Sequence, residues 1–240
     1  ITVYSISTAL AQLMVMLFSL LLARYFGPEV SGGYSATFAI VSLTSIAYNL
    51  GLDTWFLRAG AVALDLRKTY GCVLKIKAAS GLIWALLLFC IALTLRPDLY
   101  PATLMAVCIL DVWVDSIFIT SLTVLNIQRK IGQYALLILF SRGLKLIGLI
   151  ILMLLGNQNI LMFAGWKAVC SLFFAIIALL ILRPNLGQLP LSNSLEILNT
   201  VTSFALSDLL ATVYMQADVV ILSNIRGKAA TGVYSPAVSL

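Results

Sequence analysis

The segment GPEVSGGYS at residues 27–35 decides how this chain must fold, because a second copy, GKAATGVYS, stands at residues 227–235. Each copy joins two long apolar runs. An inter-helix turn that recurs after several such runs is typical of a membrane protein built from two related halves, whose interface generally forms the substrate pathway. Four positions hold the same residue in both copies: Gly27 and Gly227, Gly32 and Gly232, Tyr34 and Tyr234, Ser35 and Ser235.

The composition indicates an integral membrane protein. Of the 240 residues, 62% are hydrophobic and 10% are charged, and the mean hydropathy is +1.07. An ordinary soluble domain is about 45–50% apolar and about 25% charged. Apolar runs of about 20 residues recur along the whole chain, and each is long enough to cross a hydrocarbon core of about 30 Å as a helix. We therefore expect an all-α, polytopic transmembrane helix bundle with no soluble domain.

The apolar runs and the turn residues between them predict seven transmembrane spans and the start of an eighth. The first span is too long, and lacks the basic residues, to be a cleavable signal peptide. Because the chain does not begin with Met, we expect residues before Ile1, and we expect the rest of the second half after Leu240. The predicted spans are 3–24, 33–52, 72–95, 101–125, 133–155, 160–182 and 201–224, and the eighth begins at Thr231.

The distribution of Lys and Arg predicts the orientation, because basic residues in short loops stay on the cytoplasmic side. Basic residues gather in the connections after the second and fourth spans, whereas the connection at residues 156–159 carries no charge. The N-terminus is therefore expected in the cytoplasm, and the net charge of +6 reflects this bias, with no nucleic-acid partner. The basic residues of the two connections are Arg58, Arg67, Lys68, Lys75, Lys77, Arg129 and Lys130.

The sequence offers little for enzymatic chemistry. Histidine is absent, which removes a His-based triad and the usual zinc ligands. The four cysteines, Cys72, Cys90, Cys108 and Cys170, lie in apolar spans without a C-x-x-C pair, so we expect packing roles and no metal cluster. Nucleophile-elbow, phosphate-loop and dinucleotide motifs are also missing. We expect no enzyme, no cofactor and no metal, so any transport would draw on an ion gradient, the membrane potential or the substrate's own gradient.

Two segments resemble a known family. The run LLARYFGPEVSGGYSATFAIVSLTSIAYNLGLDTWFLR at residues 21–58 is similar to the opening of the oligosaccharide flippases, the Wzx-type repeat-unit translocases of the multidrug/oligosaccharidyl-lipid/polysaccharide exporter superfamily. The run QADVVILSNIRGKAATGVYS at residues 216–235 resembles the start of that family's second lobe, with Asp218 at its acidic position.

The resemblance implies two pseudo-symmetric six-helix lobes around a central cavity that opens alternately to each side. It implies an N-terminal lobe at 1–183, a cytoplasmic inter-lobe connection at 184–200 and the start of a C-terminal lobe at 201–240. The implied task is to flip an undecaprenyl-pyrophosphate-linked glycan across the cytoplasmic (inner) membrane. The implied partners are the lipid-linked glycan, membrane lipid, a coupling cation (sodium or proton), and the polysaccharide polymerase and glycosyltransferases.

The charges inside the spans fit such a cavity. Asp111 and Asp115 are four residues apart and share a helix face, as do Arg142 and Lys145, three residues apart. At 1.5 Å per residue, Asp115 lies about 21 Å from the outer surface and Lys145 about 20 Å from the inner one, so the two pairs should meet near mid-membrane. Either the two cations capture a pyrophosphate while Asp111 and Asp115 tune them or titrate, or all four form a closed structural ion-pair network.

Other polar residues have two interpretations each. Lys167 either lines the cavity and binds substrate or extends to the headgroups. Gln12, in a polar stripe with Ser5, Thr8 and Ser19, contacts sugar or bonds a neighbouring helix. Asp218 either takes part in ion coupling or forms an inter-lobe hydrogen bond. Asp208 is expected to share a broad helix face with Asp218. Asp53 and Arg58 form either a gate pair or an interfacial salt bridge, and the salt bridge is preferred.

Two other functions compete with the flippase. A cation-coupled multidrug or metabolite exporter of the same superfamily would favour a net acidic cavity, whereas Arg142, Lys145 and Lys167 outnumber Asp111 and Asp115. A membrane scaffold that only recruits synthesis enzymes would show no substrate-dependent change in cavity access.

Overall fold

The computed structural model describes residues 2–49, 51–61, 65–93, 100–184 and 191–238, without the side chains of residues 2, 191–203 and 237–238. Every regular element in these ranges is a helix, which confirms the predicted all-α bundle. Six stretches are long and apolar enough to cross a membrane. The helices are α1 (Thr2–Thr44), α2 (Ile46–Asn49), α3 (Leu52–Ala61), α4 (Leu66–Ala92), α5 (Ala102–Ile127), α6 (Ile131–Leu154), α7 (Ile160–Leu182) and α8 (Leu191–Val238).

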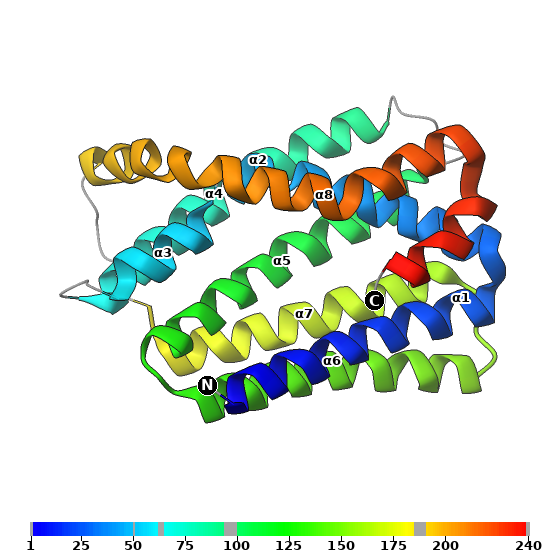
Figure 1. Ribbon diagram of the computed structural model, residues 1–240, viewed down its shortest axis with the longest axis horizontal. Helices are drawn as coiled ribbons and strands as arrows, with labels where there is room; N and C mark the ends of the chain where they lie inside the picture. Colours follow the sequence, from blue (N-terminus) through cyan, green and yellow to red (C-terminus); the bar gives the residue numbers. More distant parts are fainter. Residues whose placement is uncertain (1, 50, 62–64, 94–99, 185–190, 239–240) are drawn as a thin grey trace.

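The longest helices, α1 and α8, are hairpins. Gly27 (φ 75°, ψ 171°) and Gly227 (φ 80°, ψ −175°) leave the helical region, and the chain reverses at each of them (Figure 1). A positive φ strains any residue with a Cβ, so both repeats need glycine there. The first arm of α1 (residues 2–26) and its second arm (residues 28–44) correspond to the first two predicted spans. The arms of α8, residues 191–226 and 228–238, correspond to the seventh span and the start of the eighth.

Two predicted boundaries are wrong. The predicted second span, 33–52, is broken because α1 ends at Thr44, and the short α2 precedes Gly51, which has a φ of 78°. Residues 191–200 of the predicted inter-lobe connection form the first turns of α8, while residues 185–190 lie outside the described ranges.

The two repeats pack against each other reciprocally. A Cβ on Gly32 would collide with the carbonyl oxygen of Lys228, and a Cβ on Gly232 would collide with that of Pro28. Pro28 and Lys228 occupy the same place in their repeats, so each turn contacts the other through equivalent atoms. Such reciprocity is the mark of an approximate two-fold axis between the two turns.

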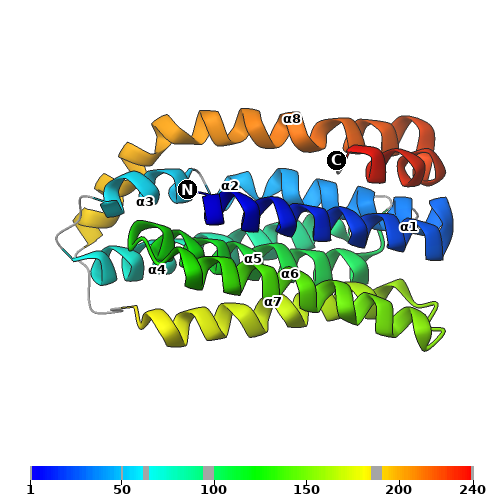
Figure 2. The ribbon, with the colours of Figure 1, turned by 60° about the horizontal axis from the view of Figure 1, so that its bottom comes forward.

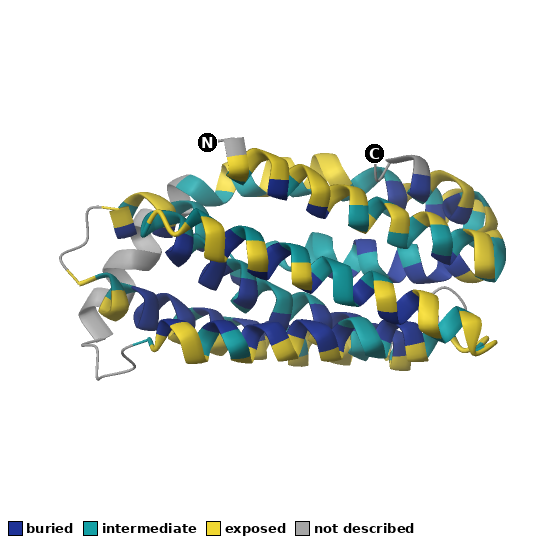
Figure 3. Ribbon diagram, turned by 90° about the horizontal axis from the view of Figure 1, so that it is seen from below, coloured by how far each residue is buried: buried dark blue, intermediate teal, exposed yellow. Residues whose placement is uncertain are grey.

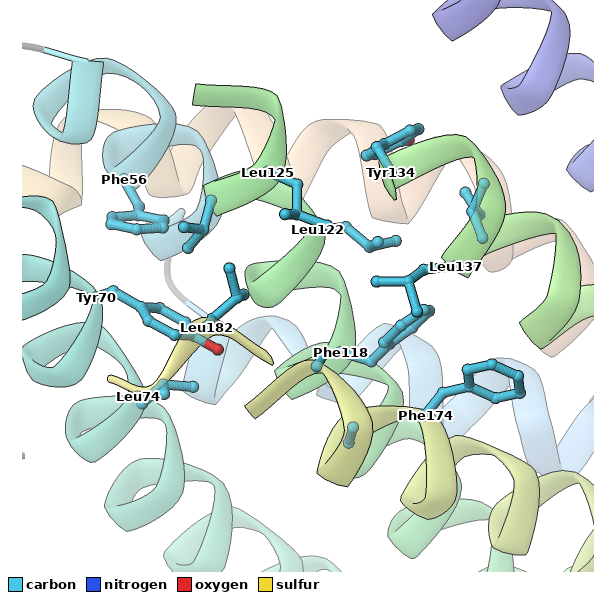
Figure 4. Packing of buried hydrophobic residues seen from close by; sticks show 14 of the residues in the cluster. Phe56, Tyr70, Leu74, Phe118, Leu122, Leu125, Tyr134, Leu137, Phe174 and Leu182 are labelled. Carbon is cyan, nitrogen blue, oxygen red and sulfur yellow. The ribbon is translucent and has the colours of Figure 1, made fainter. Parts of the chain in front are cut away.

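The bundle is layered, with α8 and the α1 hairpin on one side and α7 on the other (Figure 2). Buried residues face between the helices, and exposed residues line the outer surface (Figure 3). One core cluster joins α3, α4, α5 and α7 through Phe56, Tyr70, Phe118 and Phe174 (Figure 4). Large apolar side chains such as Leu86 and Leu180 are 60% and 69% exposed, as expected of surfaces that face lipid.

Candidate functional site

A cavity of about 710 Å³ lies between the two hairpins and the helices α5, α6 and α7. Its volume is in the usual range for ligand pockets, about 300–1,000 Å³. All three of the cations predicted to bind substrate line it, together with three carboxylates and a series of hydroxyl and amide side chains. The predicted site residues on its wall are Gln12, Asp111, Asp115, Arg142, Lys145 and Lys167.

Asp115 is the centre of the charge network. Arg142 donates to both of its carboxylate oxygens, at 3.3 and 3.1 Å, and the Lys145 ammonium donates to Oδ1 at 2.9 Å. The side chain of Lys145 is 4% exposed, whereas those of Arg142 and Asp115 are 16% and 22% exposed on the cavity side. α5 and α6 thus bring these three residues together, as expected from their depths in the predicted spans.

Asp111 has a different partner. It pairs with Lys167 of α7 at 3.1 Å and accepts a hydrogen bond from the Ser171 hydroxyl at 2.7 Å. Lys167 also donates to the hydroxyl of Tyr34 at 3.3 Å, and its ammonium lies 3.8 Å from the centre of the Phe38 ring. Lys167 thus points into the bundle, and the alternative that it extends to the headgroups is wrong. Because α5 contacts both α6 and α7, its two carboxylates form ion pairs with two different helices: Asp115 with α6 and Asp111 with α7.

The network carries a net positive charge. Three cations (Arg142, Lys145 and Lys167) face two carboxylates (Asp111 and Asp115), so one cationic charge is not balanced within the group. Charges in a cavity of low dielectric act more strongly than in water. The arrangement can attract an anionic group, with Arg142 offering planar paired donors and Lys145 a compact charge.

Two other predicted residues lie apart from this network. Gln12 lines the cavity from the first arm of α1 with an exposed side chain. Asp218 does not line the cavity: its carboxylate accepts from the Tyr234 hydroxyl at 2.7 Å and from the backbone N–H of Val219 at 2.7 Å. The hydrogen bond from Tyr234 joins the two arms of α8, so it is not the inter-lobe bond considered from the sequence.

A second buried ion pair is not predicted from the sequence. Lys77, expected in the connection after the second span, is fully buried in α4 and donates to Asp53 at 2.7 Å and to Thr120 at 2.8 Å. The expected Asp53–Arg58 salt bridge is wrong, because the Arg58 guanidinium lies 4.9 Å from the centre of the Phe204 ring. The available signal was the position of Lys77 inside an apolar run, where a charge requires a partner.

The described residues contain no group of three or more His, Cys, Asp or Glu side chains that could hold a metal ion. Cys72, Cys108 and Cys170 are buried, as expected for packing residues, whereas Cys90 is exposed on the outer face of α4.

The fold and the cavity define a polytopic α-helical membrane protein with a charged internal cavity, which is the architecture of a transporter. The chain belongs to the polysaccharide biosynthesis protein family, whose model matches residues 1–240. The resemblance to Wzx-type flippases is thereby confirmed at the level of the family. Comparisons with curated proteins and with solved structures give no match.

Proposed function

We propose that this protein flips an undecaprenyl-pyrophosphate-linked glycan across the cytoplasmic membrane by alternating access, without a covalent step. The observation that carries the proposal is the excess of one cation in the network of Arg142, Lys145, Lys167, Asp111 and Asp115 on the cavity wall. The third carboxylate of the wall, Asp53, is paired with Lys77. Arg142 and Lys145 share Asp115, so a pyrophosphate can bind one of them while Asp115 stays paired with the other. Lys167 remains with Asp111.

The rest of the wall suits both parts of such a substrate. Hydroxyl and amide side chains, among them Gln12, Ser42 and Gln216, offer hydrogen bonds to sugar hydroxyls. Met14 and Phe18 form an apolar strip that suits the lipid chain. A mixed lining of this kind favours an amphipathic solute over a small polar metabolite.

Alternating access needs an end of the cavity that can open. Ser35 and Ser235 both line the cavity, and the hydrogen bond between them lies beside the reciprocal contact of the two turns. In the predicted orientation this contact faces the outside. We assign it as the outer gate, which must separate when the glycan leaves.

The test is to deplete the intact protein in its host and to measure which leaflet holds the lipid-linked glycan. The proposal expects the glycan to accumulate on the cytoplasmic leaflet, where the polymerase cannot use it. If the glycan distributes normally while export of an organic cation falls, the protein is a cation-coupled exporter of the same superfamily.

A further inference from the structure

A second, smaller space of about 140 Å³ lies where α2 and the start of α3 meet α8. Polar groups on its wall come from Ser45, Asn49, Asp208 and Thr212. Ser45 and Asn49 also line the large cavity, so the two spaces share a wall.

The polar residues on this wall carry oxygens that can accept hydrogen bonds. The side-chain oxygen of Asn49 is buried and has no hydrogen-bond partner among the described residues. The Ser45 hydroxyl donates to the carbonyl of Ser42 at 2.7 Å, and the Thr212 hydroxyl donates to the carbonyl of Asp208 at 2.8 Å. Because both hydroxyl protons are already used, these oxygens present only lone pairs to the space. An unpartnered buried acceptor is costly, so its presence calls for an explanation.

The carboxylate of Asp208 has no cation in direct contact among the described residues. It lies inside the candidate span Phe204–Pro236, accepts a hydrogen bond from Thr54 at 3.1 Å, and forms no ion pair with any described residue. The buried ammonium of Lys77 donates to Asp53, Thr120 and the carbonyl of Ser116, and not to Asp208.

We propose that this space binds a small monovalent cation of the size of Na⁺. Carboxylate, amide and hydroxyl oxygens are the ligands of hard cations, and one carboxylate balances one positive charge, whereas a divalent ion usually takes more. Since a water molecule occupies about 30 Å³ in the liquid, the space holds an ion with a few waters. Asn49, Asp208 and Thr212 are the expected protein ligands.

The position of the site couples the ion to the large cavity. A Cβ on Gly51 would come within 2.8 Å of the backbone of Phe204 and Ala205, so the break between α2 and α3 is pressed against α8. The ion would therefore hold together a segment of the predicted first lobe and a segment of the predicted second lobe. Asn49 would contact the ion while it lines the substrate cavity. This inference goes beyond the proposed function and requires no glycolipid for its test.

The experiment measures the melting temperature of the purified full protein in nanodiscs, without glycolipid, in NaCl, LiCl or KCl against choline chloride at equal ionic strength. The proposal expects Na⁺ to raise the melting temperature in a saturable manner. Asp208→Asn should abolish the shift, and Asn49→Ala should weaken it. The control variant Glu29→Gln, at an exposed position in the turn at residues 27–35, should retain the shift. If Asp208→Asn fails to fold, Thr212→Val removes one oxygen with little change in shape and should raise the Na⁺ concentration needed for half of the shift.

Three results would overturn the assignment. The first is an equal melting temperature of the wild type in choline and in all three alkali salts. The second is an unchanged Na⁺ shift in Asp208→Asn, or in both Asn49→Ala and Thr212→Val. The third is loss of the shift in Asp218→Asn alone, which would move the ion to a different carboxylate of α8. None of these results depends on whether the protein flips a glycolipid.

Discussion

Ser35 and Ser235 are separated by 200 residues in the chain, and their hydroxyl oxygens lie 2.8 Å apart. They occupy the same place in the two repeats, so the hydrogen bond joins equivalent atoms. Gly32 and Gly232 stand beside it and allow the two backbones to touch. The two copies of the repeat thus contact each other through equivalent residues. Separating the two turns is the simplest way to open this end of the cavity.

The serine pair predicts a reversible lock. In a background in which the native cysteines are replaced, Ser35→Cys together with Ser235→Cys should form a disulfide under mild oxidation, because the two side chains already meet. The lock should stop glycolipid flipping in proteoliposomes, and reductant should restore it. Each single cysteine variant serves as the control. Flipping at the wild-type rate by the oxidised double variant would exclude this contact as a gate.

The adjacent glycines predict unequal effects of the same substitution. Gly32→Ala should weaken the contact by about 1–3 kcal/mol, because the new methyl group meets backbone that cannot yield. Gly33→Ala should be tolerated, since its methyl group would lie 3.5 Å from the flexible side chain of Lys228. Labelling of a cysteine at position 35 by an impermeant reagent reports the opening. Equal labelling in both variants would contradict the close contact at Gly32.

A second glycine pair tests the packing of α6 against α7. A Cβ on Gly148 would collide with the Trp166 indole, whereas a Cβ on Gly143 of the same helix would meet nothing within 4 Å. Gly148→Ala should therefore lower the melting temperature, by the equivalent of about 1–3 kcal/mol. Gly143→Ala should leave it unchanged or raise it, because alanine favours the helix.

The predicted orientation can be tested by single cysteines at positions 68, 129 and 157. Positions 68 and 129 should be protected from an impermeant reagent in intact cells and should react only after permeabilisation. Position 157 should react in both conditions. The reverse pattern would invert the bundle and would make the serine contact a cytoplasmic gate.

The sequence predicts some of these relationships because they depend on distance along a helix. Depth from each surface is enough to bring Asp115 to Lys145. The partner of Asp111 could not be predicted in this way, because it depends on how far α5 is rotated between α6 and α7. Lys77 lies inside the predicted span 72–95, but its pairing with Asp53 could not be predicted, because it depends on how α3 packs against α4. The small space beside Asp208 depends on the interruption of the helix at Gly51, between α2 and α3. The apolar run at residues 33–52 contains no sequence signal strong enough to predict this interruption.

Arg142 and Lys145 share Asp115, whereas Lys167 is the ion-pair partner of Asp111. Loss of Lys145 and loss of Lys167 should therefore affect stability differently. Lys145→Gln leaves Asp115 paired with Arg142, so it strands no carboxylate and should preserve the melting temperature. Lys167→Gln leaves Asp111 without its cation, and breaking such a buried pair costs about 3–5 kcal/mol. We therefore expect Lys167→Gln to be much less stable than Lys145→Gln, and the two melting temperatures check this.

The most direct test of the account is the rate of lipid-linked oligosaccharide flipping in proteoliposomes that contain the wild type, Lys145→Gln or Lys145→Arg, with the melting temperature of each measured in parallel. If the cation excess captures the pyrophosphate, Lys145→Gln should fold normally and lose most of its flipping, and Lys145→Arg should retain it because the charge is kept. Flipping by folded Lys145→Gln at the wild-type rate would contradict the central claim and would leave Lys145 as a structural partner of Asp115.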